Sequence, residues 1–164
     1  MYSDGRNTFM MAGLNSDIVK CWKQCYEQFK DQPKDIVQDI RHSGTVDDKC
    51  QAIFAYMVNN THYRLDNEGE QLIKRPARLL ADKCGDCKSY TMFIACCLHC
   101  LGIPCKVRFV NFDGGSQWTH VYAVAIDETG NEIIMDACEL NDEGIPYYDY
   151  ARRYSKKLDI NYAN

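Results

Sequence analysis

The sequence contains no long hydrophobic run and no excess of positive charge. No segment reaches the ~18 apolar residues that a transmembrane helix needs, and residues 1–14 lack the basic start and apolar core of a secretory signal. Lysine and arginine number 19 against 23 aspartates and glutamates, which gives a net charge of −4 at pH 7. Nucleic-acid-binding domains normally carry a basic surface. We therefore expect neither a membrane nor a nucleic acid as a partner.

Proline is also scarce, with 4 residues, and no repeat or linker rich in proline and glycine divides the chain. A length of 164 residues is typical of one domain with a substantial hydrophobic core. We predict a single domain over residues 15–164. Residues 1–14, which include an arginine, an aspartate and several small polar residues, are predicted to form a mobile tail.

Cysteine, by contrast, is abundant. The 10 cysteines would indicate a disulfide framework in a secreted protein. Four of them, Cys96, Cys97, Cys100 and Cys105, fall in one apolar stretch, where free thiols behave as small buried hydrophobes. Since no export signal is found, we expect a cytoplasmic protein whose thiols are mostly reduced.

Hydrophobic periodicity predicts helices in the first half of the chain and strands in the second. The predicted helices cover residues 16–29, 33–40, 45–60, 77–81 and 89–101. The predicted strands cover residues 61–65, 106–112, 118–126 and 132–138. Helices followed by antiparallel strands make an α+β domain.

The predicted helix Ser89–Leu101 is the most informative stretch. It has no formal charge unless His99 is protonated, and Gly102 with Ile103-Pro104 is a strong signal for its end. A helix that is apolar nearly all round must be covered on nearly all sides. We therefore predict that it is the central helix of the domain and packs on the sheet.

Cys87 is predicted to be the first residue of this helix, with Asp86 as its N-cap and Gly85 permitting a sharp turn into it. The unpaired amides and the positive end of the helix dipole stabilise a thiolate, which is the reactive form of cysteine. The same amides can hold the oxyanion of a tetrahedral intermediate. The charge of Asp86 opposes thiolate formation, so an imidazole partner is needed. A structural cysteine at the start of a core helix fits the same pattern.

Of the four histidines, His120 is the best placed to serve Cys87. His42 lies in a polar turn, His62 precedes the possible strand, and His99 is too far along the buried helix to meet Cys87. His120 lies in a predicted strand, where a histidine with a structural role is also common.

The hairpin that follows brings a carboxylate toward His120 in one register. If the turn is centred on Thr129 and has three or five loop residues, His120 faces Cys138 and Asp136 is its diagonal neighbour on the same face. That separation suits a hydrogen bond between imidazole and carboxylate. A loop of two or four residues would place Asp136 on the opposite face unless a bulge intervenes.

Taken together, these residues resemble the transglutaminase-like superfamily, a branch of papain-like cysteine acyltransferases and hydrolases. The matching stretch runs from about Tyr63 to Leu140, in the order Cys, His, Asp. Its motifs are Gly85-Asp86-Cys87, Leu101-Gly102-Ile103-Pro104, Val107 to Val110, Thr119-His120-Val121-Tyr122 and Met135-Asp136-Ala137. Upstream, Ile73-Lys74-Arg75-Pro76 with Leu79-Leu80 looks most like the versions found in bacteriophage and prophage genomes.

The resemblance implies a helix packed on an antiparallel sheet and a thiol protease, amidase or transglutaminase. Cys87 would be the nucleophile toward an amide or ester carbonyl, His120 the general base and acid, and Asp136 the residue that orients His120. The acyl-enzyme would pass to water or to an amine, and the sequence does not choose between them. The resemblance implies no cofactor and no metal, a protein or peptide substrate, and a cytoplasmic setting that includes a phage-infected bacterium.

The resemblance also implies a second oxyanion donor beside the Cys87 amide, for which Tyr63, Gln71 and Trp118 are all candidates. The oligomeric state and the natural substrate are not predicted.

Three other interpretations stay open. Cys84 with Cys87 and Cys97 with Cys100 have the spacing of paired zinc ligands, although the second pair falls inside the predicted buried helix. The first pair also has the spacing of thiol–disulfide enzymes, which normally have a strand directly before the motif. A catalytically inactive binding or assembly module is the third.

Overall fold

The computed structural model describes residues 2–3, 8–10, 15–42, 44–67, 71–138, 140, 144, 146–150 and 153–163. The α helices are α1 (Asn15–Phe29), α2 (Val46–Asn60), α3 (Pro76–Asp82) and α4 (Cys87–Cys100), and the 3-10 turns are η1 (Gln32–Lys34) and η2 (Ile40–His42). The strands are β1 (Tyr2–Ser3), β2 (Thr8–Met10), β3 (His62–Tyr63), β4 (Leu72–Lys74), β5 (Cys84–Gly85), β6 (Cys105–Asn111), β7 (His120–Ile126), β8 (Glu132–Met135) and β9 (Lys156–Tyr162).

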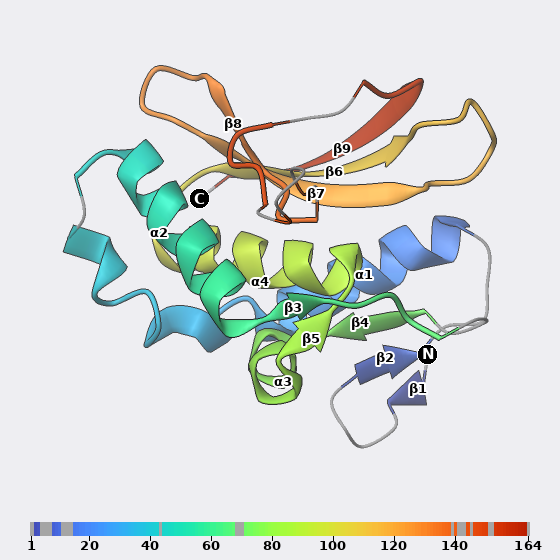
Figure 1. Ribbon diagram of the computed structural model, residues 1–164, viewed down its shortest axis with the longest axis horizontal. Coiled ribbons are helices and arrows are strands. Elements are labelled where there is room, and N and C mark those ends of the chain that lie inside the picture. The colour runs from blue at the N-terminus through green and yellow to red at the C-terminus, as the bar shows by residue number, and fades with distance from the viewer. Residues whose placement is uncertain are drawn as a thin grey trace.

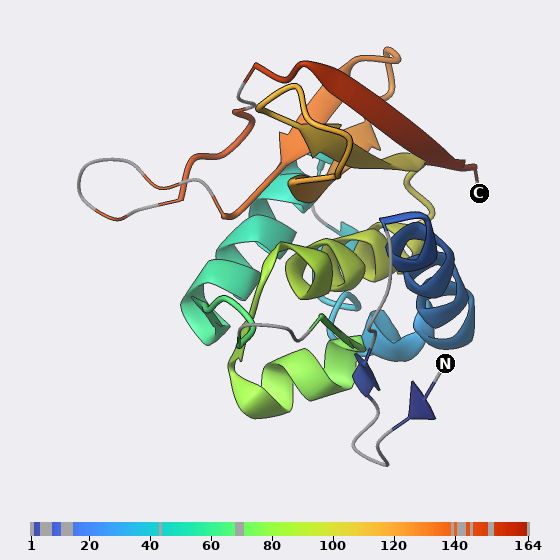
Figure 2. The ribbon, with the colours of Figure 1, turned by 90° about the vertical axis from the view of Figure 1, so that its right-hand side faces the viewer.

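The architecture is α+β, as predicted. A four-stranded antiparallel sheet with the order β8-β7-β6-β9 lies over a layer that contains α1, α2 and α4 (Figure 1). The short strands β3, β4 and β5, together with α3, lie on the other side of these helices (Figures 1 and 2). None of the described helices is long and apolar enough to cross a membrane.

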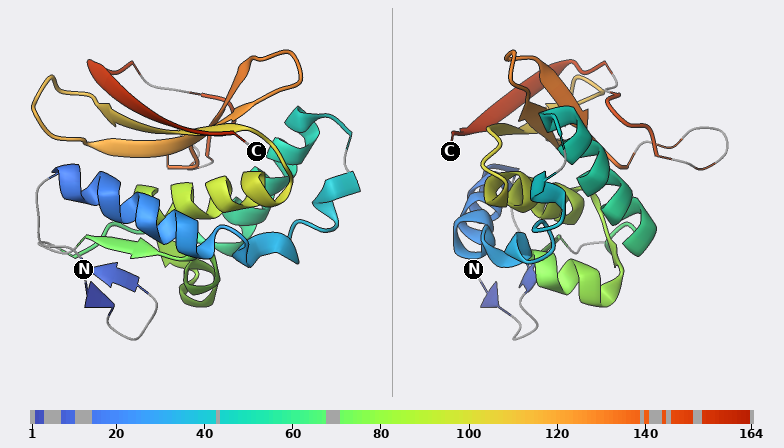
Figure 3. Two further views of the ribbon diagram at one scale, coloured as in Figure 1. Left: turned by 180° about the vertical axis from the view of Figure 1, so that it is seen from behind. Right: turned by 90° about the vertical axis from the view of Figure 1, so that its left-hand side faces the viewer.

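Helix α4 is the central helix that the sequence predicts. Every residue from Lys88 to Leu98 is buried. Met92, Ala95 and Cys96 pack in a cluster with side chains of α1, whereas Phe93 and Cys97 pack in a second cluster with side chains of α2. Both clusters also contain side chains of the sheet, so α4 is enclosed by the sheet and two helices (Figure 3).

The β7–β8 hairpin has the register in which His120 and Asp136 are diagonal neighbours. Ala123 pairs with Met135 and Ile126 with Glu132, so a five-residue turn joins the strands. The Asp127 carboxylate closes this turn by accepting hydrogen bonds from the backbone amides of Thr129 and Asn131, both at 2.8 Å. The register therefore rests on a turn with its own hydrogen bonds.

Strand β9 was not predicted from the sequence. It pairs antiparallel with β6 at the edge of the sheet, and most of its residues are exposed or half-buried. Asp159 of β9 accepts a hydrogen bond of 2.7 Å from the buried Arg108 of β6, which also binds Glu132 beside β7. An edge strand with little apolar burial has weak periodicity, and for that reason the pattern did not reveal it.

Two predictions for the first half of the chain remain to be compared with the structure. Over the predicted helix 33–40 the structure has the end of η1, turns over residues 35–39 and the first residue of η2. Pro33 and Val37 are the only buried residues of this range and supply no continuous apolar stripe. The predicted mobile tail is described only at β1 and β2, and β2 pairs antiparallel with β4. The rest of the predicted tail lies outside the described residues.

Candidate active site

Cys87 is the first residue of α4, and Asp86 caps the helix as predicted. The Asp86 carboxylate accepts hydrogen bonds from the backbone amides of Lys88 at 3.1 Å and Ser89 at 3.5 Å. The backbone amide of Cys87 has no acceptor among the described residues. It is therefore available to an oxyanion that forms beside the sulfur.

A two-stranded parallel pair holds the turn into α4 in place. Tyr63 of β3 is the register partner of Gly85 in β5, and the backbone amide of Arg64 donates a 2.9 Å hydrogen bond to the Gly85 carbonyl. A Cβ atom at residue 85 would lie 2.7 Å from the Leu79 side chain and 2.9 Å from that of Ser89. Gly85 is thus required by close packing, rather than by the sharp turn expected from the sequence.

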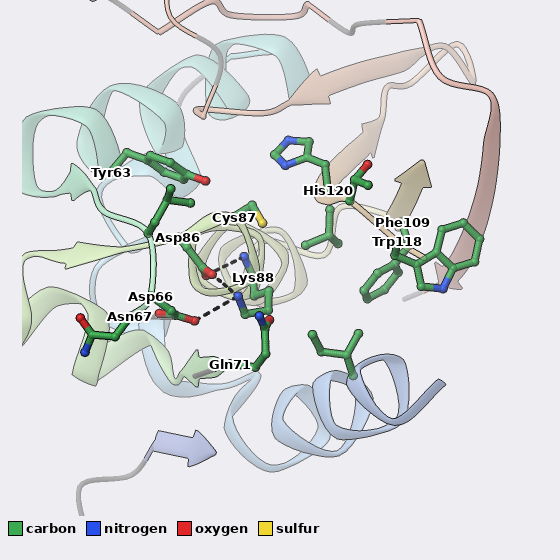
Figure 4. A pocket seen from close by; sticks show the side chains of 14 residues that line it. Tyr63, Asp66, Asn67, Gln71, Asp86, Cys87, Lys88, Phe109, Trp118 and His120 are labelled. Carbon is green, nitrogen blue, oxygen red and sulfur yellow. Dashed lines mark hydrogen bonds and ion pairs between the residues drawn. The ribbon is translucent and has the colours of Figure 1, made fainter. Parts of the chain in front are cut away.

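Cys87 is half-buried and lines a cleft of about 370 Å³ between the helices and the sheet (Figure 4). His120 lies next to Cys87 in this cleft. The three candidate oxyanion donors, Tyr63, Gln71 and Trp118, also line it.

His120 and Asp136 form a hydrogen bond of 2.6 Å between Nε2 and Oδ2, with side chains that are 9% and 5% exposed. The other carboxylate oxygen of Asp136 accepts a hydrogen bond of 3.1 Å from the backbone amide of Cys138. Since Nε2 is engaged with the carboxylate, Nδ1 is the ring nitrogen left for another partner. The structure therefore brings the predicted base and its predicted orienting group together.

Several influences shift the pKa of the His120 imidazole. Burial lowers it, but hydrogen bonding to Asp136 and the interaction with Cys87 outweigh burial and raise the pKa to about 10. A protonated His120 is thus favoured between a carboxylate and a thiol that becomes negative when it ionises. This environment suits a thiolate–imidazolium pair.

Beside Cys87 lies a cluster of charged side chains that the sequence did not predict. Lys88 is buried and forms ion pairs with Asp86 and, at 3.1 Å, with Asp66 (Figure 4). Burial lowers the pKa of Lys88, but the nearby charges of Asp86, Cys87 and Asp66 outweigh burial. The pKa is therefore raised above its ordinary value. The ammonium offsets the carboxylate charge that was expected to oppose the Cys87 thiolate. Asp66 is far from Lys88 in sequence, so spacing gave no signal of the pair.

Tyr63 is the candidate donor that the fold fixes most firmly. Its ring makes an edge contact with Tyr90 at a centroid distance of 5.8 Å, and its hydroxyl is directed toward Cys87 (Figure 4). Tyr63 is 37% exposed, and the partial burial of its hydroxyl, with a smaller contribution from Cys87, raises the pKa of that hydroxyl. The hydroxyl has no hydrogen-bond partner among the described residues. It is therefore free to donate to a bound molecule.

The other two candidate donors are placed less well. Trp118 lies with Phe109 on the opposite side of the cleft from Tyr63 (Figure 4). The Lys156 ammonium lies over the Trp118 ring, 5.0 Å from its centroid. The Gln71 side chain is exposed and lies beside Lys88.

In the described part of the chain, the other histidines and the two cysteine pairs offer no alternative site. His42 and His62 are exposed, and His99 lies 3.2 Å from Asp31, consistent with their exclusion as bases. All ten cysteines are free, and neither of the two cysteine pairs with zinc-like spacing belongs to a cluster of metal-ligating side chains among the described residues. Helix α3 precedes the Cys84-Gly85-Asp86-Cys87 motif, and the two-residue strand β5 forms its first half. The strand that thiol–disulfide enzymes normally have before this motif is thus replaced here by a helix.

A family model described as "Transglutaminase-like superfamily" matches residues 34–136. No curated protein matches the chain. A crystal structure described as "a putative cysteine protease from Cytophaga hutchinsonii" is similar, with a TM-score of 0.48 and 17% sequence identity over 94% of this chain and 50% of that one. The present chain thus spans about half the length of that protein.

Proposed function

The chain belongs to the transglutaminase-like superfamily, whose model matches more than half of its length, and on this premise we propose that it is a cysteine acyl-transfer enzyme acting on amide or ester bonds. The observation that supports the proposal most strongly is the 2.6 Å His120–Asp136 hydrogen bond beside Cys87 at the start of α4. A nucleophile, a base and an orienting carboxylate in one cleft are what covalent acyl transfer requires. A protein or peptide is the proposed substrate.

In the proposed reaction, the Cys87 thiol gives its proton to His120 Nδ1 and the sulfur attacks the carbonyl carbon. Asp136 keeps the imidazole oriented and stabilises its protonated form. The tetrahedral intermediate collapses when its C–N or C–O bond breaks, and the leaving group takes the proton from His120. Water or an amine then attacks the thioester and releases Cys87. Water makes the enzyme a peptidase or amidase, and an amine makes it a transglutaminase.

The oxyanion of the intermediate would be held by two donors, the Cys87 backbone amide and the Tyr63 hydroxyl. Both lack an acceptor among the described residues, and the Tyr63 hydroxyl points toward Cys87 (Figure 4). The β3–β5 pairing fixes Tyr63 one strand away from the turn that carries Cys87. Preorganised donors are effective because they need no rearrangement as the charge develops.

The cellular setting and the domain limits belong to the proposal as well. Ten free cysteines, most of them buried, fit a reducing compartment such as the cytoplasm. The matched residues 34–136 lie inside the proposed domain 15–164. The likeness of residues 73–76 to bacteriophage versions stays a prediction.

The proposed nucleophile is tested by alkylating the folded, reduced protein with iodoacetamide and following each cysteine by peptide mass spectrometry. We expect Cys87 to react much faster than the other nine cysteines and to lose this advantage in His120→Ala. Cys84→Ser is the matched control, because Cys84 lies three residues away and has no role in the proposed reaction; it should leave the rate at Cys87 unchanged. A Cys87 that reacts no faster than its neighbours would favour the inactive binding module.

A further inference from the structure

Cys138 lies beside the His120–Asp136 pair, and the proposed reaction does not use it. One ring nitrogen of His120, one carboxylate oxygen of Asp136 and the Cys138 sulfur all lie within 4.8 Å of one another. In the part of the chain that the structure describes, no other three side chains of histidine, cysteine, aspartate or glutamate come so close. The group therefore calls for a chemical explanation of its own.

The backbone holds the three side chains together without a metal. The amide of Cys138 donates a 3.1 Å hydrogen bond to Asp136 Oδ1, while Asp136 Oδ2 accepts from His120. Asp136 and the two residues after it close the end of β8, opposite the start of β7. Because the hairpin register sets this arrangement, little backbone movement is needed to bring the three donors around one ion.

Imidazole nitrogen, carboxylate oxygen and thiolate sulfur are the ligands that Zn²⁺ prefers, at about 2.0 to 2.3 Å. Around a four-coordinate ion of this size, ligand atoms are separated by roughly 3.3 to 3.8 Å. The His120–Asp136 contact of 2.6 Å would widen and the sulfur would move inward by a comparable amount. We propose that His120, Asp136 and Cys138 form a binding site for Zn²⁺ or a similarly thiophilic divalent cation, with water as the fourth ligand.

Occupation of this site competes with catalysis. The ion takes the place of the proton between His120 and Asp136 and of the Cys138 thiol proton, and both protons pass to solvent. An imidazole whose Nε2 is bound to a cation, and whose carboxylate is shared with that cation, no longer becomes a stable imidazolium beside Cys87. This competition rests on the proposed function, whereas metal binding itself does not.

Cobalt(II) is the probe, because cobalt bound to a thiolate gives a charge-transfer band in the near ultraviolet and a tetrahedral site gives strong visible bands. We expect the reduced wild-type protein to develop these bands with about one equivalent of Co²⁺ and to lose them when Zn²⁺ is added. Cys138→Ser should abolish the charge-transfer band, and its affinity for Zn²⁺ should fall by more than the ~10–100-fold that loss of an outer-shell partner costs.

Two control variants locate the thiolate. Cys87→Ala and Cys84→Ser should both keep the band, because neither sulfur is a ligand in the proposed site. Absence of the band in the wild-type protein, or its survival in Cys138→Ser, would overturn the proposal. Loss of the band in Cys84→Ser would also overturn it and would favour the Cys84–Cys87 pair. Circular dichroism of each variant shows that it is folded.

A second measurement tests the competition. Zn²⁺ should remove the fast alkylation of Cys87 in the wild-type protein and leave it in Cys138→Ser. Fast alkylation that persists in zinc-saturated wild-type protein would refute the competition. If Cys87 has no fast alkylation even without zinc, the proposed function fails, and the cobalt spectra still decide whether the metal site exists.

Discussion

The Nε2 atom of His120 lies 2.6 Å from Oδ2 of Asp136, although 16 positions separate the two residues in the chain. His120 opens β7 and Asp136 directly follows β8, so the length of one hairpin turn determines whether they meet. The Asp127 carboxylate holds that turn through backbone amides. The proposed base and its proposed orienting group are thus positioned relative to each other by one hairpin.

Replacing Asp136 with asparagine is expected to lower kcat for hydrolysis of p-nitrophenyl acetate by roughly 10³–10⁴-fold with little change in KM. The amide loses the charge that stabilises a protonated His120 and favours the wrong tautomer. Steady-state kinetics on the folded variant measure this effect. Asp35→Asn, at an exposed position, is the control and should retain full activity. Equal activities of the two variants would contradict the role of Asp136.

Replacing Tyr63 with phenylalanine removes only the proposed oxyanion donor. We expect acylation of Cys87 by p-nitrophenyl acetate to slow by ~10²-fold, near the lower end of the effect of losing one donor. Alkylation of the same sulfur by iodoacetamide passes through no oxyanion, so its rate should stay unchanged. The ratio of the two rates separates loss of a donor from a general disturbance of the thiol.

The rival donors provide the comparison for Tyr63→Phe. Trp118→Phe and Gln71→Leu should change the ratio of acylation to alkylation by less than Tyr63→Phe does, and Tyr147→Phe, at an exposed hydroxyl, should not change it. If the ratio of acylation to alkylation falls more in Trp118→Phe or in Gln71→Leu than in Tyr63→Phe, that residue is the oxyanion donor instead.

Replacing Lys88 with methionine should destabilise the fold by about 3–5 kcal/mol, because Asp86 and Asp66 would be left in a buried site without their cation. Urea unfolding followed by circular dichroism measures the loss. Lys20→Met, at an exposed position of α1, should cost far less. Adding Asp66→Asn to Lys88→Met should restore part of the stability. A loss no larger than that of Lys20→Met would show that the ion cluster contributes little.

The raised pKa of His120 predicts a pH dependence of stability. Its protonated form is favoured by folding, so the stabilisation is complete below the ordinary pKa of 6.5 and is lost as the pH rises toward about 10. The difference in unfolding free energy between wild type and His120→Ala should therefore shrink between these two pH values. Urea unfolding at a series of pH values measures it. A difference that stays constant over this range would mean that folding does not favour the protonated imidazole.

Features with local causes were predictable from the sequence. Asp86 as an N-cap and the burial of α4 follow from capping chemistry and apolar composition, which act between near neighbours. The β7–β8 register depends on the turn length, for which the sequence left two alternatives open. The proposed site residues Cys87, His120 and Asp136 each belong to one of these elements or directly follow it.

Features that depend on contacts between distant segments were not predictable. The pairing of Lys88 with Asp66, and of Tyr63 with Gly85, joins residues that have no common periodicity. Asp159 of strand β9 pairs with Arg108 of β6, 51 positions away in the chain, and with Lys157 of its own strand. The sequence alone predicts no role for Cys138, because the proposed role depends on His120 and Asp136, which lie beside it only in the folded protein.

The division of the site between two layers has a consequence for synthesis. Cys87 belongs to the helical layer, and the chain carries it out of the ribosome before His120 and Asp136, since synthesis proceeds from the N-terminus. A nascent or partly unfolded chain therefore displays an ordinary thiol, without base or carboxylate. In the proposed reaction, the activated thiol would arise only when the β7–β8 hairpin docks on α4, so unfinished chains would not carry it.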